Sequence, residues 1–513
     1  PAENVTVKAI FEPIPAALYN VAVNGSYAGT SGAGSYAQGA AVTINAGSRS
    51  SYSFAGWSSS GGVAFADANS STTTFIMPDK DVTVTAAWRY SGGSSGSGES
   101  SGDKGGSPSS AVSEQKPAAR VLDSNKAVIK TIPIIMDKSK GVFTAAPDSP
   151  SLTAAFDKSK ADAQGVRTIK IDIPDMSGAK AYEAVLPASF FTSGNGKKRI
   201  EIKTGIASVE VPDNMLTDTA GMQKVSLIVA AVDNGSLPEN IKKQINGGPV
   251  MDLSMKIDGK QILWNNEDAP VKAAIPYKPA GEVTGNLEHI VICYIDGSGN
   301  MITVPNGRYD QAAGTMTFSS TRFGRYAAAY VYKTFDDLSM TEWARKAIET
   351  MASKGILTGT GLNTYSPAGN ITRADYLAFL IKTLGLTASF EDNFEDVKSG
   401  AYYYEAIGVA KKLGIAAGSG NNQFKPQESI SRQDMMVLTA RALEKFKKFK
   451  VMGNTSALDG FSDKGDIYDY AAESLAALVR EGLITGFGNK LNPHSRVTRA
   501  EAAVFLYRIY NKY

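Results

Sequence analysis

One pattern occurs three times in the last third of the chain and constrains the fold more than any other feature. Each copy opens with an aromatic residue followed two positions later by an aspartate. An apolar spacing of helical period follows, then a Gly-x-x-x-Gly segment and a proline-containing loop. Each copy closes on a short motif, in which the three arginines lie 59 and 67 residues apart, as do the three opening phenylalanines Phe335, Phe394 and Phe461. The copies are therefore in register and predict three similar helical units.

The closing motif combines a capping pattern with an arginine. Its copies are Thr372-Arg-Ala-Asp375, Ser431-Arg-Gln-Asp434 and Thr498-Arg-Ala-Glu501. The hydroxyl residue and the acid have the N-cap and N3 spacing of a capping box, which is worth ~1 kcal/mol. The arginine is not needed for capping. At the first helical position, free N–H groups and the helix dipole favour an anion, and a guanidinium can pair with a carboxylate through two hydrogen bonds. Spacing alone leaves ligand binding and a salt bridge between units equally open.

The three copies resemble surface-layer homology (SLH) domains, whose signature includes Thr-Arg-Ala-Glu. The copies occupy 334–390, 391–456 and 457–513. The resemblance implies a pseudo-threefold unit, rich in α-helix, that binds a secondary cell-wall polymer, often through a pyruvylated N-acetylmannosamine. It favours ligand binding by the motif arginines, although the first two motifs depart mildly from the signature. The resemblance assigns the polymer site to Arg373, Arg432, Arg499, Asp337, Asp396, Asp463, Gly359, Gly418 and Gly486.

Other readings of these residues stay open. Each of the three aspartates precedes a helix, so helix capping is the leading alternative role. The glycines are expected in turns where a sugar can approach the backbone. For Trp343 and Tyr403 we expect core packing rather than stacking on a sugar.

The N-terminal part carries a second repeat. Residues 4–11 reappear as 81–88, so 1–14 is interpreted as the end of a preceding repeat and 15–90 as one complete unit. Alternating apolar residues predict strands at 19–23, 41–44, 52–57, 72–77 and 82–88.

This unit resembles internalin-type B repeats in its Gly34–Gly39, Phe54–Trp57 and Thr74–Pro78 segments. The resemblance implies a β-grasp-like spacer or adhesion module. We expect Trp57 and Trp88 in its core rather than on a glycan. Residues 91–117 read as a Gly/Ser linker.

The middle segment, 118–333, shows repeated strand and turn signals and predicts a β-sandwich in one or two lobes. Its last part resembles a β-domain common before cell-wall anchors. Cys293 lies in an alternating apolar run and is expected to be a buried thiol, and His289 is expected on a strand surface. A Lys–Asn isopeptide crosslink is a minor alternative.

Composition excludes several classes of protein. The net charge is +3, which argues against nucleic acid as a partner, and no apolar run is long enough to cross a membrane. A single cysteine forbids an intrachain disulfide, and two distant histidines make a His-based metal site improbable. No cofactor is expected; Ca²⁺ is conceivable, but no motif indicates it. The Gly-, Ser-, Thr- and Tyr-rich composition and the start at Pro1 suggest a processed or truncated extracellular protein.

The sequence therefore predicts a non-enzymatic Gram-positive surface protein, multidomain, with all-β modules followed by the helical SLH unit. The SLH unit would anchor it non-covalently to the wall polymer, with the β modules as spacer or adhesin. Two alternatives remain: a self-assembling surface-layer or filament subunit that binds copies of itself, and the anchor end of a surface enzyme whose catalytic domain lies upstream.

Overall fold

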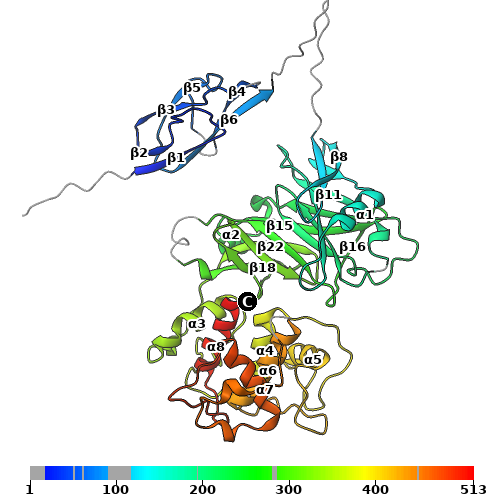
Figure 1. Ribbon diagram of the computed structural model, residues 1–513, viewed down its shortest axis with the longest axis vertical. Helices are drawn as coiled ribbons and strands as arrows, with labels where there is room; N and C mark the ends of the chain where they lie inside the picture. Colours follow the sequence, from blue (N-terminus) through cyan, green and yellow to red (C-terminus); the bar gives the residue numbers. More distant parts are fainter. Residues whose placement is uncertain are drawn as a thin grey trace, which may run out of the picture. The chain divides into compact units, whose positions relative to one another are not determined.

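The computed structural model describes residues 18–49, 52–59, 63–90, 117–192, 194–279, 286–446 and 450–513. The chain divides into two compact units, Pro1–Val112 and Ser113–Tyr513, which are treated separately (Figure 1). The strand expected within 1–14 and nearly all of the linker expected at 91–117 lie outside the described residues.

The first unit is an all-β module with all five predicted strands and one more. Strands β2, β1, β6 and β4 form one sheet in that order, with β1 and β6 parallel, and β3 pairs with β5. Trp57 is buried in its core, as expected, and Trp88 is half-buried, with its indole N–H donating to the Gly25 carbonyl. The strands are β1 (Leu18–Asn24), β2 (Gly34–Ala37), β3 (Ala41–Asn45), β4 (Tyr52–Ser59), β5 (Thr72–Ile76) and β6 (Val82–Tyr90).

The second unit opens with a β-sandwich built from one continuous sheet. Strand β8 (Val128–Asp137) pairs with β7 (Ala118–Leu122) through its first half and with β9 (Val142–Ala145) through its second half, so it joins the two faces. Apolar side chains from both faces, such as Ile171, Ile202, Leu227 and Leu253, belong to one core. The sandwich therefore has one lobe, and the two-lobe alternative is wrong.

The remaining sandwich strands include those that the sequence signals mark and others that the sequence did not reveal. They are β7 (Ala118–Leu122), β9 (Val142–Ala145), β10 (Arg167–Asp172), β11 (Ala181–Pro187), β12 (Lys198–Lys203), β13 (Ser208–Pro212), β14 (Lys224–Ala231), β15 (Val250–Ile257), β16 (Lys260–Ile262), β17 (Val271–Pro276), β18 (Ile290–Ile295), β19 (Met301–Val304), β20 (Arg308–Asp310), β21 (Thr315–Ser320) and β22 (Gly324–Tyr330), with helices α1 (Ser149–Lys158) and α2 (Glu239–Ile245).

The helical part closes into a ring of three repeats. The backbone N–H of Ile371 donates to Val497, that of Val497 to Ile430, and that of Ile430 to Ile371. Each repeat contributes two helices, and all three share one apolar core. This cyclic exchange confirms the pseudo-threefold packing. The helices are α3 (Glu342–Ser353), α4 (Arg373–Leu384), α5 (Tyr404–Lys412), α6 (Arg432–Lys445), α7 (Asp469–Arg480) and α8 (Arg499–Lys512).

The sandwich and the ring meet in a junction of buried polar contacts. His289 is only 2% exposed, and its Nδ1 lies 2.8 Å from the Ser353 hydroxyl, so the expectation of a strand-surface position is wrong. The Lys354 ammonium donates to the Ile290 carbonyl, and the Tyr510 hydroxyl donates to the Gly307 carbonyl. The sandwich is therefore seated directly on the ring.

Cys293 lies on β18 and is buried, as expected. Burial raises the pKa of its thiol to about 11, so the reactive thiolate is scarce at neutral pH.

Candidate functional site

The three motif arginines join each repeat to the next. The Nε–H of Arg373 donates to the Phe424 carbonyl at 3.0 Å, and those of Arg432 and Arg499 donate to the equivalent carbonyls of the next repeats at 3.1 and 2.8 Å. The Arg373 backbone N–H donates to the Glu428 carbonyl, and the other two follow the same pattern. The expectation that this N–H would be free for an anion is therefore wrong, because the neighbouring repeat supplies its acceptor.

The guanidinium groups also face carboxylates of the next repeat. The N–O distances are 3.7 Å from Arg373 to Asp434, 3.3 Å from Arg432 to Glu501 and 2.8 Å from Arg499 to Asp375. The arginine side chains are 14%, 24% and 4% exposed, respectively. Salt bridges between repeats therefore exist, and Arg432 is the most accessible of the three arginines.

The three repeat aspartates organise loops rather than helix ends. Asp337 accepts hydrogen bonds from the backbone N–H groups of Tyr365 and Ser366, almost thirty residues away in the same repeat. Asp396 and Asp463 hold the corresponding loops in the same way. The helix-capping interpretation of these aspartates is therefore wrong. They fix the loops that present the carbonyl acceptors of the motif arginines.

The repeat glycines are required by close packing within each repeat. A Cβ on Gly418 would lie 2.7 Å from the Gln423 carbonyl oxygen and 2.8 Å from the Phe394 ring. Gly359 and Gly486 meet the equivalent atoms of their own repeats. Backbone and ring atoms of the same repeat occupy the space that a side chain would need, so packing alone accounts for these glycines.

An aromatic residue eight or nine positions after each repeat's opening phenylalanine marks where the threefold symmetry breaks. The Tyr402 hydroxyl donates to Asp375, and the Tyr470 hydroxyl donates to Asp434 at 2.7 Å. Burial and the neighbouring carboxylate raise the pKa of Tyr470, so its hydroxyl stays protonated and can donate. The matching residue of the first repeat is Trp343, which has no hydroxyl and is 63% exposed. Its expected place in the core is wrong.

Tyr403, by contrast, is buried as expected. Only the third closing motif forms a complete capping box, because Glu501 is long enough to reach back to the Thr498 N–H. Thr372 and Ser431 cap their helices through the hydroxyl alone.

A pocket of about 170 Å³ lies beside Trp343, where all three repeats contribute. Its lining includes Arg432 from the second repeat and Gly486 and Glu501 from the third. Arg508 of α8 also lines it, is exposed, and makes no ion pair with any described residue. Two guanidinium groups thus face one carboxylate, which leaves the pocket cationic.

Of the nine residues predicted for the polymer site, Arg432 and Gly486 line this pocket, and the other seven lie elsewhere. Sequence reasoning missed Arg508, for which the repeated motif gives no signal. It also misjudged Trp343, which departs from the tyrosines at the matching positions of the other repeats.

Two kinds of feature are absent from the part of the chain that the structure describes. It contains no group of three or more His, Cys, Asp or Glu side chains arranged to hold a metal ion. In the same residues, no helix combines the length and the hydropathy that a membrane span needs.

Comparison with protein families identifies both repeat types. Residues 19–92 match the divergent InlB B-repeat domain, and residues 334–377, 393–436 and 460–503 match the S-layer homology domain. The chain thus carries a β-repeat of this family and three SLH domains.

Two kinds of curated protein align with parts of this chain: glycosidases and S-layer proteins. An amylopullulanase from Thermoanaerobacterium thermosulfurigenes is 31% identical over 326 residues, 63% of this chain and 17% of the relative. Exoglucanase XynX from Acetivibrio thermocellus is 36% identical over 35% of this chain and 16% of its own length. The S-layer protein EA1 from Bacillus anthracis is 30% identical over 39% of this chain and 23% of its own.

The chain spans less than a quarter of each of these relatives. The alignment with the amylopullulanase is longer than the whole segment 334–513, so it extends into the sandwich. SLH domains and S-layer relatives together identify a cell-surface protein anchored at the cell wall.

Proposed function

We propose that the pocket beside Trp343 holds an acidic unit of a secondary cell-wall polymer and so anchors the chain non-covalently. The pyruvylated N-acetylmannosamine expected from the SLH resemblance has the chemistry that this pocket suits. The observation that carries the proposal is the break in symmetry: this interface has an exposed tryptophan where the others have a hydrogen-bonded tyrosine.

The lining supports binding of a sugar carboxylate. Arg432 and Arg508 can donate paired hydrogen bonds to a carboxylate, and these are stronger than hydrogen bonds between neutral groups. The exposed indole of Trp343 offers an apolar face for a sugar ring. Glu501 already engages Arg432 and the helix N-terminus, so it orients that guanidinium at the pocket wall.

Co-sedimentation of the full chain with purified sacculi tests this site. We expect Arg432→Gln and Arg508→Gln each to weaken binding about tenfold or more, because each removes a charged donor. Arg373→Gln is the matched control, since it alters the equivalent arginine of another interface, and should change binding little. Sacculi stripped of the secondary polymer should not bind the wild-type chain.

Circular dichroism of each variant shows whether it is folded. Equal loss in Arg373→Gln and Arg432→Gln would reject the choice of this pocket. Full binding by folded Arg432→Gln and Arg508→Gln chains would reject both arginines as polymer contacts.

For the chain as a whole we propose a non-catalytic role as anchor and spacer. The glycosidases among the relatives align over less than a fifth of their length, which fits shared accessory domains. An enzyme with its catalytic domain upstream is tested by sequencing the complete coding region.

A lattice or filament subunit is the second candidate, favoured by the S-layer relative. Negative-stain microscopy of concentrated protein with and without Ca²⁺ tests it: ordered sheets or fibres support assembly, and persistent monomers contradict it.

A further inference from the structure

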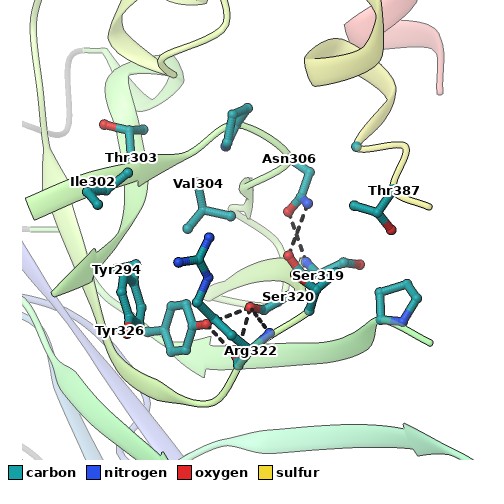
Figure 2. A pocket seen from close by; sticks show the side chains of 14 residues that line it. Tyr294, Ile302, Thr303, Val304, Asn306, Ser319, Ser320, Arg322, Tyr326 and Thr387 are labelled. Carbon is teal, nitrogen blue, oxygen red and sulfur yellow. Dashed lines mark hydrogen bonds between the residues drawn. The ribbon is translucent and has the colours of Figure 1, made fainter. Parts of the chain in front are cut away.

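A second pocket, of about 240 Å³, lies where the sandwich meets the first SLH repeat. Strands β18 and β19 provide Tyr294 and Thr303, the turn between β21 and β22 provides Arg322, and the segment after α4 provides Thr387. Figure 2 shows Arg322 extending from this turn into the space between Tyr294 and Val304. The pocket shares no lining residue with the pocket beside Trp343.

Arg322 is held in place while its donors stay free. Its guanidinium carbon lies 5.1 Å from the centre of the Tyr294 ring, a cation–π contact. Its backbone carbonyl accepts from the Tyr326 hydroxyl at 2.7 Å, and its N–H donates to the Ser320 hydroxyl. Among the described residues, the guanidinium makes no hydrogen bond or ion pair, and the acidic neighbour Glu267 lies beyond ion-pair distance. The turn therefore presents an oriented and unpaired cation.

The walls around this cation are also fixed. The Asn306 side chain donates to the Ser319 carbonyl at 3.0 Å and accepts from the Ser319 N–H at 2.9 Å. The Thr387 hydroxyl donates to the Glu267 carbonyl at 2.7 Å, which ties the wall from the SLH repeat to the sandwich. A ligand would meet a preformed site and lose little free energy to ordering it.

We propose that this junction pocket binds an acidic saccharide residue, with its carboxylate on Arg322. A planar guanidinium matches a carboxylate, and Thr321, which also lines the pocket, carries a hydroxyl that can pair with a sugar hydroxyl. The pocket is smaller than the ~300–1,000 Å³ of sites that enclose drug-sized ligands, so it suits a single sugar residue. The proposal does not depend on the polymer site beside Trp343.

Saturation-transfer NMR on the full chain tests it with D-galacturonic and D-glucuronic acid, and with D-galactose as the uncharged comparison. We expect at least one uronic acid to bind and D-galactose to bind at least about tenfold more weakly. Arg322→Gln should reduce uronic acid binding about tenfold or more. Arg120→Gln, an exposed sandwich arginine outside the pocket, is the matched control and should leave binding unchanged.

Arg432→Gln separates the two sites, because the pocket beside Trp343 is also proposed to hold a sugar carboxylate. Uronic acid binding should persist in the Arg432→Gln chain and should be lost when Arg322→Gln is added to it. Sacculi sedimentation with Arg322→Gln then identifies the source: weaker sedimentation indicates that the wall polymer supplies the acid, and unchanged sedimentation indicates another acidic glycan. Failure of both uronic acids to bind, or equal binding by Arg322→Gln and wild type, would overturn the proposal.

Discussion

At the scale of single residues, the three motif arginines share a position but not an environment. Arg499 donates to the Tyr365 and Thr358 carbonyls and pairs with Asp375, and it is almost fully buried. We expect Arg499→Gln to cost ~3 kcal/mol of stability, because it leaves a poorly exposed carboxylate and two carbonyls without a cation.

Arg432→Gln should cost at most ~1 kcal/mol, since its ion pair is partly exposed to solvent. Thermal unfolding followed by circular dichroism at the helical band compares the two variants. Similar melting temperatures for both would show that burial does not separate a structural arginine from an accessible one.

Lys354 gives the junction a pH dependence. Burial, with the nearby Arg308, lowers the pKa of Lys354 from 10.5 to about 7; Glu288 partly opposes this, and Tyr510 and His289 also face the ammonium. Between about pH 7 and 10.5 the unfolded chain holds a proton that the folded chain has released, so this group makes stability rise with pH over that window.

Lys354→Met should remove that rise. Thermal unfolding of wild type and variant from pH 6.5 to 9.5 gives the measurement, and the difference between the two curves cancels the other titrating groups. Parallel curves over this range would contradict the assigned role of Lys354.

At the scale of helices, the caps at the starts of α4, α6 and α8 differ in strength. Thr498 both accepts from the Glu501 N–H and donates to its carboxylate, whereas Thr372 and Ser431 accept only. We expect Thr498→Ala to destabilise the ring by ~1–2 kcal/mol and Ser431→Ala by ~1 kcal/mol. Urea unfolding followed by the helical signal ranks them, and a larger effect for Ser431→Ala would contradict this order.

The sequence predicted these helices well, because their signals are local. Helical periodicity marked α3, and the Thr372 to Asp375 spacing marked the N-cap of α4. Short edge strands such as β2 and β19 were missed, since four residues carry too little alternation to recognise. The arginine motif was found, but not the acceptors of its N–H groups, because those come from a different repeat.

The same limit explains the errors about His289 and Trp343. His289 directly precedes the apolar strand β18, and only the packing of Ser353 against it shows that it is buried. Trp343 has a helical core spacing, yet it faces a pocket lined by two other repeats. Contacts between repeats depend on how distant segments meet, which no local spacing encodes.

At the scale of the whole second unit, contacts between the repeats and contacts between the ring and the sandwich together hold the structure. The three repeats close on one another through Ile371, Ile430 and Val497, so none of them buries its core alone. The sandwich contacts the ring through Glu288. This carboxylate accepts a hydrogen bond from the Tyr507 hydroxyl at 2.6 Å and forms an ion pair with Lys346. Anchoring of the ring therefore orients the sandwich as well.

This coupling predicts a single, narrow distance between sandwich and ring. Spin labels at Lys138→Cys and Glu473→Cys, both exposed, report it by double electron–electron resonance, while the buried Cys293 thiol should resist labelling.

Glu288→Ala combined with Tyr510→Phe should broaden this distribution, because it removes the contacts of Glu288 with α3 and α8 and the hydrogen bond to Gly307. Glu239→Ala, which breaks a surface pair on α2, is the control and should leave it narrow. A distribution already broad in the otherwise unaltered chain would mean that the junction contacts are too weak to hold the two parts together, and that wall binding fixes only the ring.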